Sequence, residues 1–309
     1  MTRPLRAFAA IAALCLVAPA HAQDADASDS IVVTAQRSGA PMWTIDTAGG
    51  AVILVGEIVA VPEATPWQPY RLEQATAGAG RVILGGRGKI SPGDILRLIF
   101  AGGAITKLPD STTTADYLDP AQSARLAALG EAYGQDYARK SFLITAYDLL
   151  SRRLGFTRDT TRDASDVVRR AARRADVPAQ PVGTVRGEDM LDNLAAADPR
   201  SHLACLDAAM TATETGPDLI AARGEAWRSR DVRAVMANPL EIALGRCWPW
   251  ADEEMGPLLR ERWVEAIRQA TGEDGVTLAV VPLRVLAEED GVLDQLDALG
   301  FTVAGPQWR

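Results

Sequence analysis

The sequence predicts an α/β protein, in which a mixed central β-sheet built from N- and C-terminal strands is covered by many helices from the middle of the chain. Short apolar and β-branched runs, bounded by glycine or proline, cluster toward the two ends of the chain. Most segments between residues 120 and 236 instead have the apolar spacing of amphipathic helices. The length of 309 residues is enough for one large domain or two small ones, and the hydrophobic content of 48% fits a well-packed core.

The first 22 residues are expected to lie outside this fold. Two arginines precede an apolar run over residues 7–17, and an A-x-A cleavage signal follows at 20–22. This pattern predicts a secretory signal peptide, with a mature chain that begins near Gln23. We expect the small, polar residues 23–40 to be a flexible segment. No later stretch approaches the roughly 18 apolar residues of a membrane span, so the sequence predicts a soluble, exported, periplasmic protein.

The charge balance argues against one class of partner. The chain carries 32 basic and 40 acidic residues. The predicted signal peptide removes two of the basic residues and no acidic ones, which leaves 30 against 40, or −10. Because nucleic-acid binding depends on a positive surface that neutralises phosphates, we expect no nucleic-acid partner.

Two cysteines, Cys205 and Cys247, remain after the predicted signal peptide, which contains Cys15. In an oxidising compartment such a pair usually forms a disulfide. Closing a loop of this length would stabilise the fold by about 3–4 kcal/mol in the chain-entropy model. The alternative is a pair of buried thiols on separate helices. A metal site is not indicated, because other ligands are missing nearby.

The first strands follow the flexible segment. Residues 42–59 alternate, turn at Gly49-Gly50 and then run apolar, which is typical of a β-hairpin. Residues 81–86 predict a third short strand. The stretch 91–103 begins with Ser-Pro and ends with Gly-Gly, which are start and stop signals of a helix.

The helical middle and the C-terminal part complete the expected sheet. Residues 180–185 interrupt the helices as a predicted strand. Residues 252–272 predict a long helix, and 276–283 predict a buried strand. Residues 290–305 read as a helix, a glycine cap and a last strand.

The two ends of the chain carry a resemblance to a known family. The stretch "PMWTI" at 41–45 precedes a second strand that runs into residues 56–62, and Trp67 follows. The chain ends with "PLRVL" at 282–286 and then "AEEDGVLDQL" and "LGFTV" within 287–303. This framework resembles the TraB/GumN family, which includes Tiki-like proteases. The resemblance implies a single domain of that kind over residues 41–309.

The resemblance also implies a metal site, from which this sequence departs. Family members are thought to bring a divalent metal to two strand ends with two Gly-x-x-His motifs. Here Val59 and Val285 stand at the histidine positions, and a valine has no lone pair to donate. Arg262 keeps a family arginine, but Trp263 replaces its asparagine neighbour. The degenerate family site therefore consists of Gly56, Glu57, Val59, Arg262, Arg284 and Val285.

A count of histidines supports the same interpretation. The chain has two histidines, and one of them, His21, belongs to the predicted signal peptide. The mature chain would keep only His202, so a mechanism that requires two histidines cannot operate. We expect Val59 and Val285 to pack against each other and fill the former site. No metal and no other cofactor is expected.

Glu57 stands where the family has threonine, and its role is open. It is most simply a solvated acid at the end of a strand. Paired with Arg284 or Arg262, it would form an ion pair that closes the old pocket. With the acidic run 288–290 (Glu288, Glu289 and Asp290), it would form a rebuilt carboxylate site, with or without a metal held by oxygen ligands.

His202 lies beside Asp198 and Ser201, which suggests a catalytic triad. These residues are neighbours on one turn, without a nucleophile elbow or an oxyanion loop. Asp198 followed by proline is instead a typical start of a helix.

Three further stretches have two interpretations each. "GGRGKIS" at 85–91 resembles a phosphate-binding loop but lacks its spacing and its Ser/Thr after lysine. "VVRRAARRAD" at 167–176 is either a solvated helix face or a surface for anionic lipid or polysaccharide. "RCWPW" at 246–250 is either core packing beside a disulfide or an aromatic site for sugars.

The sequence thus leaves three hypotheses for function. The first is a catalytically degenerate pseudoenzyme that acts as a binding or envelope-associated module, with an envelope protein or a polysaccharide as partner. The second is a metal-dependent or carboxylate-based, protease-like hydrolase with a rebuilt site. The third is an accessory factor in extracellular polysaccharide production.

Overall fold

The computed structural model describes residues 39–85, 87–89, 103 and 105–309. The predicted signal peptide lies outside these residues, as does the predicted flexible segment up to residue 38. The predicted helix 91–103 also lies outside them, except for its last residue. In the part of the chain that is described, no helix is both long and apolar enough to cross a membrane.

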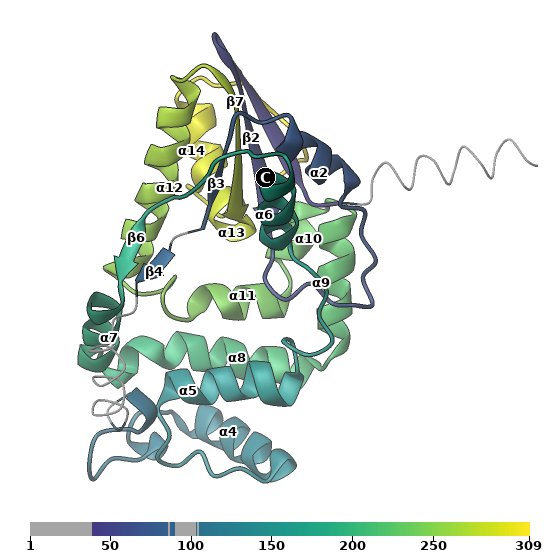
Figure 1. Cartoon of the computed structure of the whole chain (residues 1–309). Coiled ribbons are helices and arrows are strands. Elements are labelled where there is room, and N and C mark those ends of the chain that lie inside the picture. The colour runs from purple at the N-terminus through teal and green to yellow at the C-terminus, as the bar shows by residue number, and fades with distance from the viewer. Residues whose placement is uncertain (1–38, 86, 90–102, 104) are drawn as a thin grey trace, which may run out of the picture. The chain divides into compact units, whose positions relative to one another are not determined.

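A six-stranded mixed sheet forms the centre of the fold, with the strand order β5-β3-β7-β2-β1-β8 (Figure 1). Its strands are β1 (Met42–Thr47), β2 (Gly50–Glu57), β3 (Arg81–Leu84), β5 (Ala179–Pro181), β7 (Gly275–Pro282) and β8 (Val303–Ala304). The four strands β5, β3, β7 and β2 are parallel, whereas β1 pairs antiparallel with both β2 and β8. The predicted mixed sheet from both ends of the chain is therefore confirmed.

The predicted hairpin is formed by β1 and β2. Their register pairs Thr47 with Gly50, so the turn lies at residues 48 and 49. Gly50 also pairs with Gly275 of β7, and a Cβ atom on Gly50 would overlap the backbone of Gly275. Glycine is needed here because two backbones approach closely.

Helices cover both faces of the sheet. Figure 1 shows α12 (Met255–Thr271) and α14 (Val292–Ala298) on one side, and α2 (Tyr70–Ala77) and α6 (Ala164–Arg174) on the other. Buried residues of these helices and of the strands form one apolar core, in which Trp43 and Trp227 are among the largest side chains. Burial of this apolar surface is what holds helices and sheet together.

A second apolar core lies within the helical middle of the chain, as the periodicity predicts. Its larger buried side chains include Phe142, Leu206 and Met210. The helices of this part are α4 (Pro120–Tyr133), α5 (Phe142–Tyr147), the π-helix η2 (Asp148–Leu154), α7 (Gly187–Ala196), α8 (Leu203–Thr215), α9 (Asp218–Arg228), α10 (Val232–Met236) and α11 (Pro239–Arg246). Helix α11 packs on α8 and lies between it and the ends of the strands (Figure 1).

The predicted strand at 180–185 is two short strands in different sheets. Residues up to Pro181 belong to β5, and β6 (Thr184–Arg186) pairs with β4 (Arg87–Lys89) in a separate two-stranded sheet. The described part of the "GGRGKIS" stretch is therefore largely a strand and not a phosphate-binding loop. The described residues also form the short helices η1 (Thr114–Asp116), η3 (Pro199–His202) and α13 (Leu283–Ala287).

Candidate functional site at the strand ends

The two motif positions lie at the same edge of the sheet, because β2 and β7 are parallel and Glu57 pairs with Pro282. Gly56 is tightly enclosed there. A Cβ atom on it would lie 2.6 Å from Leu283 Cδ1, and its carbonyl oxygen accepts a hydrogen bond of 2.9 Å from Trp227 Nε1. The glycine thus lets β2 pass close to α13, and the strand end is fixed by an indole from α9.

The two valines do not form a buried pair. Val285, on α13, is 1% exposed and belongs to the core around the sheet. Val59, in the loop that follows β2, is 53% exposed. The expectation that they fill the former site together is therefore wrong. The physical reason is that the backbone after Glu57 leaves the sheet, so the Val59 side chain extends to the surface.

A buried charge network bridges the two motif positions instead. Arg223 NH1 donates a hydrogen bond of 2.9 Å to the carbonyl oxygen of Val59. Its Nε and NH2 groups contact Glu241 Oε2 at 2.7 and 2.5 Å. Arg284 NH2 contacts Glu241 Oε1 at 2.6 Å. We call Arg223, Glu241 and Arg284 the buried triad, since they are 2%, 5% and 8% exposed.

The triad holds its central carboxylate in the charged form. Burial raises the pKa of Glu241, but the charges and hydrogen bonds of Arg223 and Arg284 lower it by more than burial raises it. The pKa therefore lies below its ordinary value. Arg284 also donates to the backbone carbonyl of Glu241. Gly245 leaves room for this guanidinium, because a Cβ atom there would overlap it. Arg284 is therefore bound to α11 and is not the partner of Glu57.

Glu57 is bound to the start of α6. Its Oε1 accepts a hydrogen bond of 2.7 Å from Ser165 N, and its Oε2 accepts one of 2.9 Å from Ser165 Oγ. Burial, and next the charge of Asp163, raise the pKa of Glu57 to about 7. Asp163 is the N-cap of α6. The carboxyl group thus ties the end of β2 to the first turn of α6 and is largely protonated below neutral pH.

The acidic run that follows α13 does not converge on Glu57. Glu288 forms an ion pair with Arg260 of α12. Among the described residues, no group of three His, Cys, Asp or Glu side chains is placed to hold a metal ion. With valines at both histidine positions, the residues at the strand ends do not fit the divalent metal that the family resemblance implies.

The other positions that the family resemblance singles out lie within the scaffold of the fold. Arg262 of α12 lies beside Gly183. Its Cδ is 3.3 Å from the position that a Cβ atom on Gly183 would occupy. Trp263 is buried in the core around the sheet. Trp67 packs edge-on against Trp227, with ring centroids 5.0 Å apart. These contacts place Arg262 and Trp67 on the scaffold that surrounds the strand ends.

His202, Ser201 and Asp198 do not form a catalytic triad. Ser201 Oγ donates to the backbone carbonyl of Asp198 at 2.7 Å, and Asp198 Oδ1 accepts from Arg200 N at 2.8 Å. Asp198 is the N-cap of η3, as the Asp-Pro pattern predicts. Burial lowers the pKa of His202, with Asp252 acting in the opposite direction. The serine proton is thus committed to the backbone and not to the imidazole.

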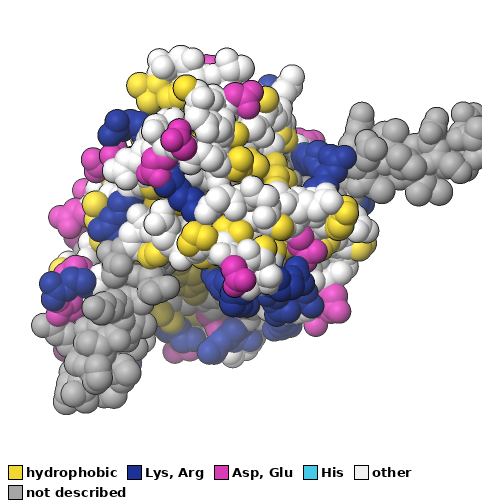
Figure 2. Space-filling model, turned by 45° about the horizontal axis from the view of Figure 1, so that its top comes forward, with side chains coloured by type: hydrophobic (Ala, Val, Ile, Leu, Met, Phe, Trp, Pro, Cys, Tyr) yellow, Lys and Arg dark blue, Asp and Glu magenta, His cyan; other side chains and the backbone are white. Residues whose placement is uncertain are grey.

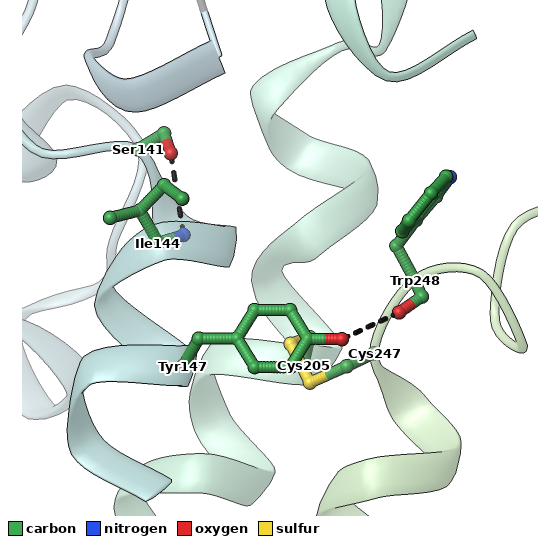
Figure 3. The surroundings of a disulfide bond; sticks show 6 residues. All are labelled: Ser141, Ile144, Tyr147, Cys205, Cys247 and Trp248. Carbon is green, nitrogen blue, oxygen red and sulfur yellow. Dashed lines mark hydrogen bonds between the residues drawn. A yellow bond between two sulfur atoms is a disulfide. The ribbon is translucent and has the colours of Figure 1, made fainter. Parts of the chain in front are cut away.

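The predicted disulfide is present. Cys205 of α8 and Cys247, which follows α11, are bonded and fully buried (Figure 3). Tyr147 Oη donates to the carbonyl oxygen of Trp248 at 2.8 Å, while the indole of Trp248 points away from the sulfur atoms in Figure 3. Trp248 packs on the helical core. The core interpretation of the "RCWPW" stretch is therefore favoured.

Sequence patterns gave no signal for the residues that bridge the site. Arg223, Glu241 and Ser165 belong to helices of the middle region, and none of them forms part of a motif. A charged residue on an amphipathic helix is normally solvated. A signal would have required knowing which helix faces meet beneath the strand ends.

Comparison with known proteins covers this same region. A model of the TraB/PrgY/gumN family matches residues 41–304, which include both strand ends, the buried triad and the helical core. A comparison with curated proteins gives no match.

Proposed function

The chain belongs to the TraB/PrgY/gumN family, and we propose that it is a non-catalytic member that acts as a binding or envelope-associated module. One observation carries this proposal. The family resemblance implies metal ligands at two strand ends, but Val59 and Val285 stand at those positions. Beneath them lies a charge network whose members pair with one another. A binding role needs the scaffold but not the metal.

The internal pairing of the triad supports the proposal. Both oxygen atoms of Glu241 are engaged by guanidinium groups. Arg223 donates in addition to the Val59 carbonyl. A catalytic group must instead reach a reacting atom within hydrogen-bond distance. Buried charges that are paired and hydrogen-bonded in this way are structural groups.

Metal content tests the proposal. The purified chain would be dialysed against Mn²⁺ and Zn²⁺, then against metal-free buffer, and measured by mass spectrometry. We expect far less than one retained ion per chain. About one tightly held ion per chain would overturn the proposal, and the Glu57→Gln variant would then show whether that carboxyl is a ligand.

A second candidate, a carboxylate-based hydrolase, is favoured by one observation. Burial, and next the charge of the nearby Asp163, raise the pKa of Glu57 to about 7, a value typical of acid–base catalysts at neutral pH. A fluorescent casein assay distinguishes the candidates. Hydrolysis by the wild-type chain that is lost in a folded Glu57→Gln variant would support a hydrolase, and no hydrolysis by either would support the binding role.

We also propose that the chain is exported, with residues 1–22 removed and the mature protein in the periplasm. The A-x-A signal at 20–22 supports this, as does the disulfide between Cys205 and Cys247, a bond that is typical of oxidising compartments. Intact-mass measurement on a periplasmic fraction would give a chain starting at Gln23. A full-length mass in the cytoplasmic fraction would contradict export.

An accessory role in extracellular polysaccharide production is a third candidate. Its support is the exposed arginine-rich face of α6 on a chain that is acidic overall. Deleting the gene tests it through the yield of secreted polysaccharide. A clear loss that plasmid-borne wild type restores would favour this role, and an unchanged yield would leave an envelope protein as the partner to seek.

A further inference from the structure

A cavity of about 440 Å³ lies between α6 and the ends of two parallel strands, and we call it the β3–β5 cavity. Its lining comes from Leu84 at the end of β3 and Gly85 after it, from Arg169, Ala172 and Arg173 of α6, and from strand β5 with Val177 before it. Its volume is within the range of small-molecule sites.

The position of the cavity is one where ligands are expected. Strands β3 and β5 are parallel, with Leu84 paired to Pro181. In open α/β sheets, ligands bind outside the carboxyl ends of the parallel strands. The cavity shares no lining residue with the buried triad or with Glu57.

The charged side chains among the described lining residues are two arginines. Arg169 and Arg173 are one turn apart on α6 and face the same way, and no acidic residue is among the described residues that line the cavity. Arg169 also contacts Asp166 at 3.1 Å on its own helix. Arg173 forms no ion pair with any described residue, whereas its neighbour Arg174 is bound to Glu73 at 2.9 Å.

This positive lining is notable because the whole chain has a net charge of −8. On the face that Figure 2 presents, several Lys and Arg side chains gather in a dark blue patch at the lower centre, and others are scattered over the same face. Guanidinium groups recognise carboxylate and phosphate oxygens by paired hydrogen bonds. The lining therefore selects an anion.

Apart from the two arginines and Gln180, the described lining is apolar or glycine. Leu84 and Ala172 are buried, and Val177 and Pro181 are half-buried. Gly85 leaves open space, because a Cβ atom on it meets no described atom within 4 Å. A bare ion would leave this apolar surface in contact with water, whereas a ligand with an apolar body would cover it.

We propose that the β3–β5 cavity binds a small organic anion, with one phosphate or carboxylate group held by Arg169 and Arg173 and an apolar body on Leu84 and Ala172. This proposal goes beyond the loss of the metal site. It stands whether or not the strand ends prove catalytic, because the two regions share no residue.

Calorimetric titration with octyl phosphate at low salt tests the charge of the site. We expect one site per chain, and an affinity about tenfold weaker in Arg173→Gln, since one charge-assisted contact is lost. Arg169→Gln should weaken binding in the same direction. Arg170→Gln is the matched control, because Arg170 is an exposed arginine of α6 that does not line the cavity, and its affinity should equal that of the wild type.

A second variant tests the shape of the site without changing charge. Gly85→Leu fills the open space beside β3 and should reduce octyl phosphate affinity while the unfolding midpoint stays unchanged. Inorganic phosphate should bind more weakly than octyl phosphate, because it lacks the apolar body. Equal loss of affinity in Arg170→Gln, no loss in Arg173→Gln, or binding only to phosphatidylglycerol vesicles would each overturn the proposal.

Discussion

Two glutamates near the ends of the strands have pKa values that are shifted in opposite directions. Glu241, from α11, lies between Arg223 and Arg284, and its pKa falls below the ordinary value despite burial. Glu57, from β2, meets Ser165 and the like charge of Asp163, and its pKa rises to about 7. The comparison teaches that the partner, and not burial alone, decides the charge of a carboxyl group.

The same difference separates two structural roles. A carboxylate between two guanidinium groups is part of a compensated network, and removing it leaves two buried charges without a partner. A carboxyl group that is neutral at pH 6 acts as an uncharged hydrogen-bonding group, and only its ionisation is costly. Substitutions at the two positions should therefore differ in size and in pH dependence.

The largest effect is expected for Glu241→Gln. The amide keeps the volume but loses the charge, so Arg223 and Arg284 remain buried with uncompensated charges. We expect a loss of about 3–5 kcal/mol in the free energy of unfolding, measured by urea titration at pH 7. Glu265→Gln is the control, because Glu265 is a surface acid paired only along α12, and its midpoint should not move. A Glu241→Gln variant as stable as the control would contradict the role assigned to the triad.

Glu57→Gln should show a smaller effect of opposite sign. The amide resembles the protonated carboxyl group, so the variant avoids the cost of ionising a buried acid. We expect it to match the wild type at pH 4 and to exceed it by about 1–3 kcal/mol above pH 8. Thermal or urea unfolding across this pH range measures the difference.

The sign follows from proton binding. The pKa of Glu57 is raised from 4.5 when unfolded to about 7 when folded, so the folded state binds more protons between these values. The contribution of Glu57 is therefore fully present below pH 4.5 and is lost as the pH rises through 7. A difference between variant and wild type that stays constant from pH 5 to 8 would contradict the raised pKa.

Asp163→Asn sharpens the comparison by removing the like charge. Asparagine also caps helices well, so α6 should keep its start. The pKa of Glu57 in the folded state should fall, so the loss of stability that starts near pH 4.5 should end at a lower pH and be smaller than in the wild type, by about 1 kcal/mol near neutral pH. The pH profile of unfolding checks this. An unchanged profile would mean that burial alone raises the pKa.

An effect of similar size to that of Asp163→Asn is expected for Ser165→Ala. This change removes the hydroxyl donor to Glu57 and keeps the backbone donor. We expect a loss of about 0.5–1.5 kcal/mol and a further rise in the pKa of Glu57, because hydrogen bonds to the ionised form are lost. Ser201→Ala is a suitable comparison, since its hydroxyl bonds only to a backbone carbonyl on its own turn. A pKa of Glu57 that falls in Ser165→Ala would contradict this geometry.

Much of the fold could be predicted from the sequence, because local patterns carry it. Alternation and glycine placed the β1–β2 hairpin, and apolar spacing placed the helices of the middle region. The disulfide followed from cysteine count and the predicted compartment. The prediction of a single strand at residues 180–185 was only partly correct, because strands of three residues are too short to show alternation.

The site itself could be predicted only in what it lacks. The absence of histidine at Val59 and Val285 is visible in the sequence. The partners of Arg284 and Glu57 are not, because Glu241 is 43 residues from Arg284 and Ser165 is 108 residues from Glu57. Such pairs depend on how helix faces pack beneath the sheet, which periodicity does not specify.

Site-specific titration of the two glutamates is the most direct test of the account. Carbon-detected NMR of labelled glutamate side chains would follow both carboxyl groups, with Glu57→Gln and Glu241→Gln used to assign the signals. The account predicts that Glu57 titrates near pH 7 and that Glu241 stays ionised to a pH below the ordinary glutamate range. A Glu57 signal that titrates near 4.5, or a Glu241 that is protonated at neutral pH, would contradict it.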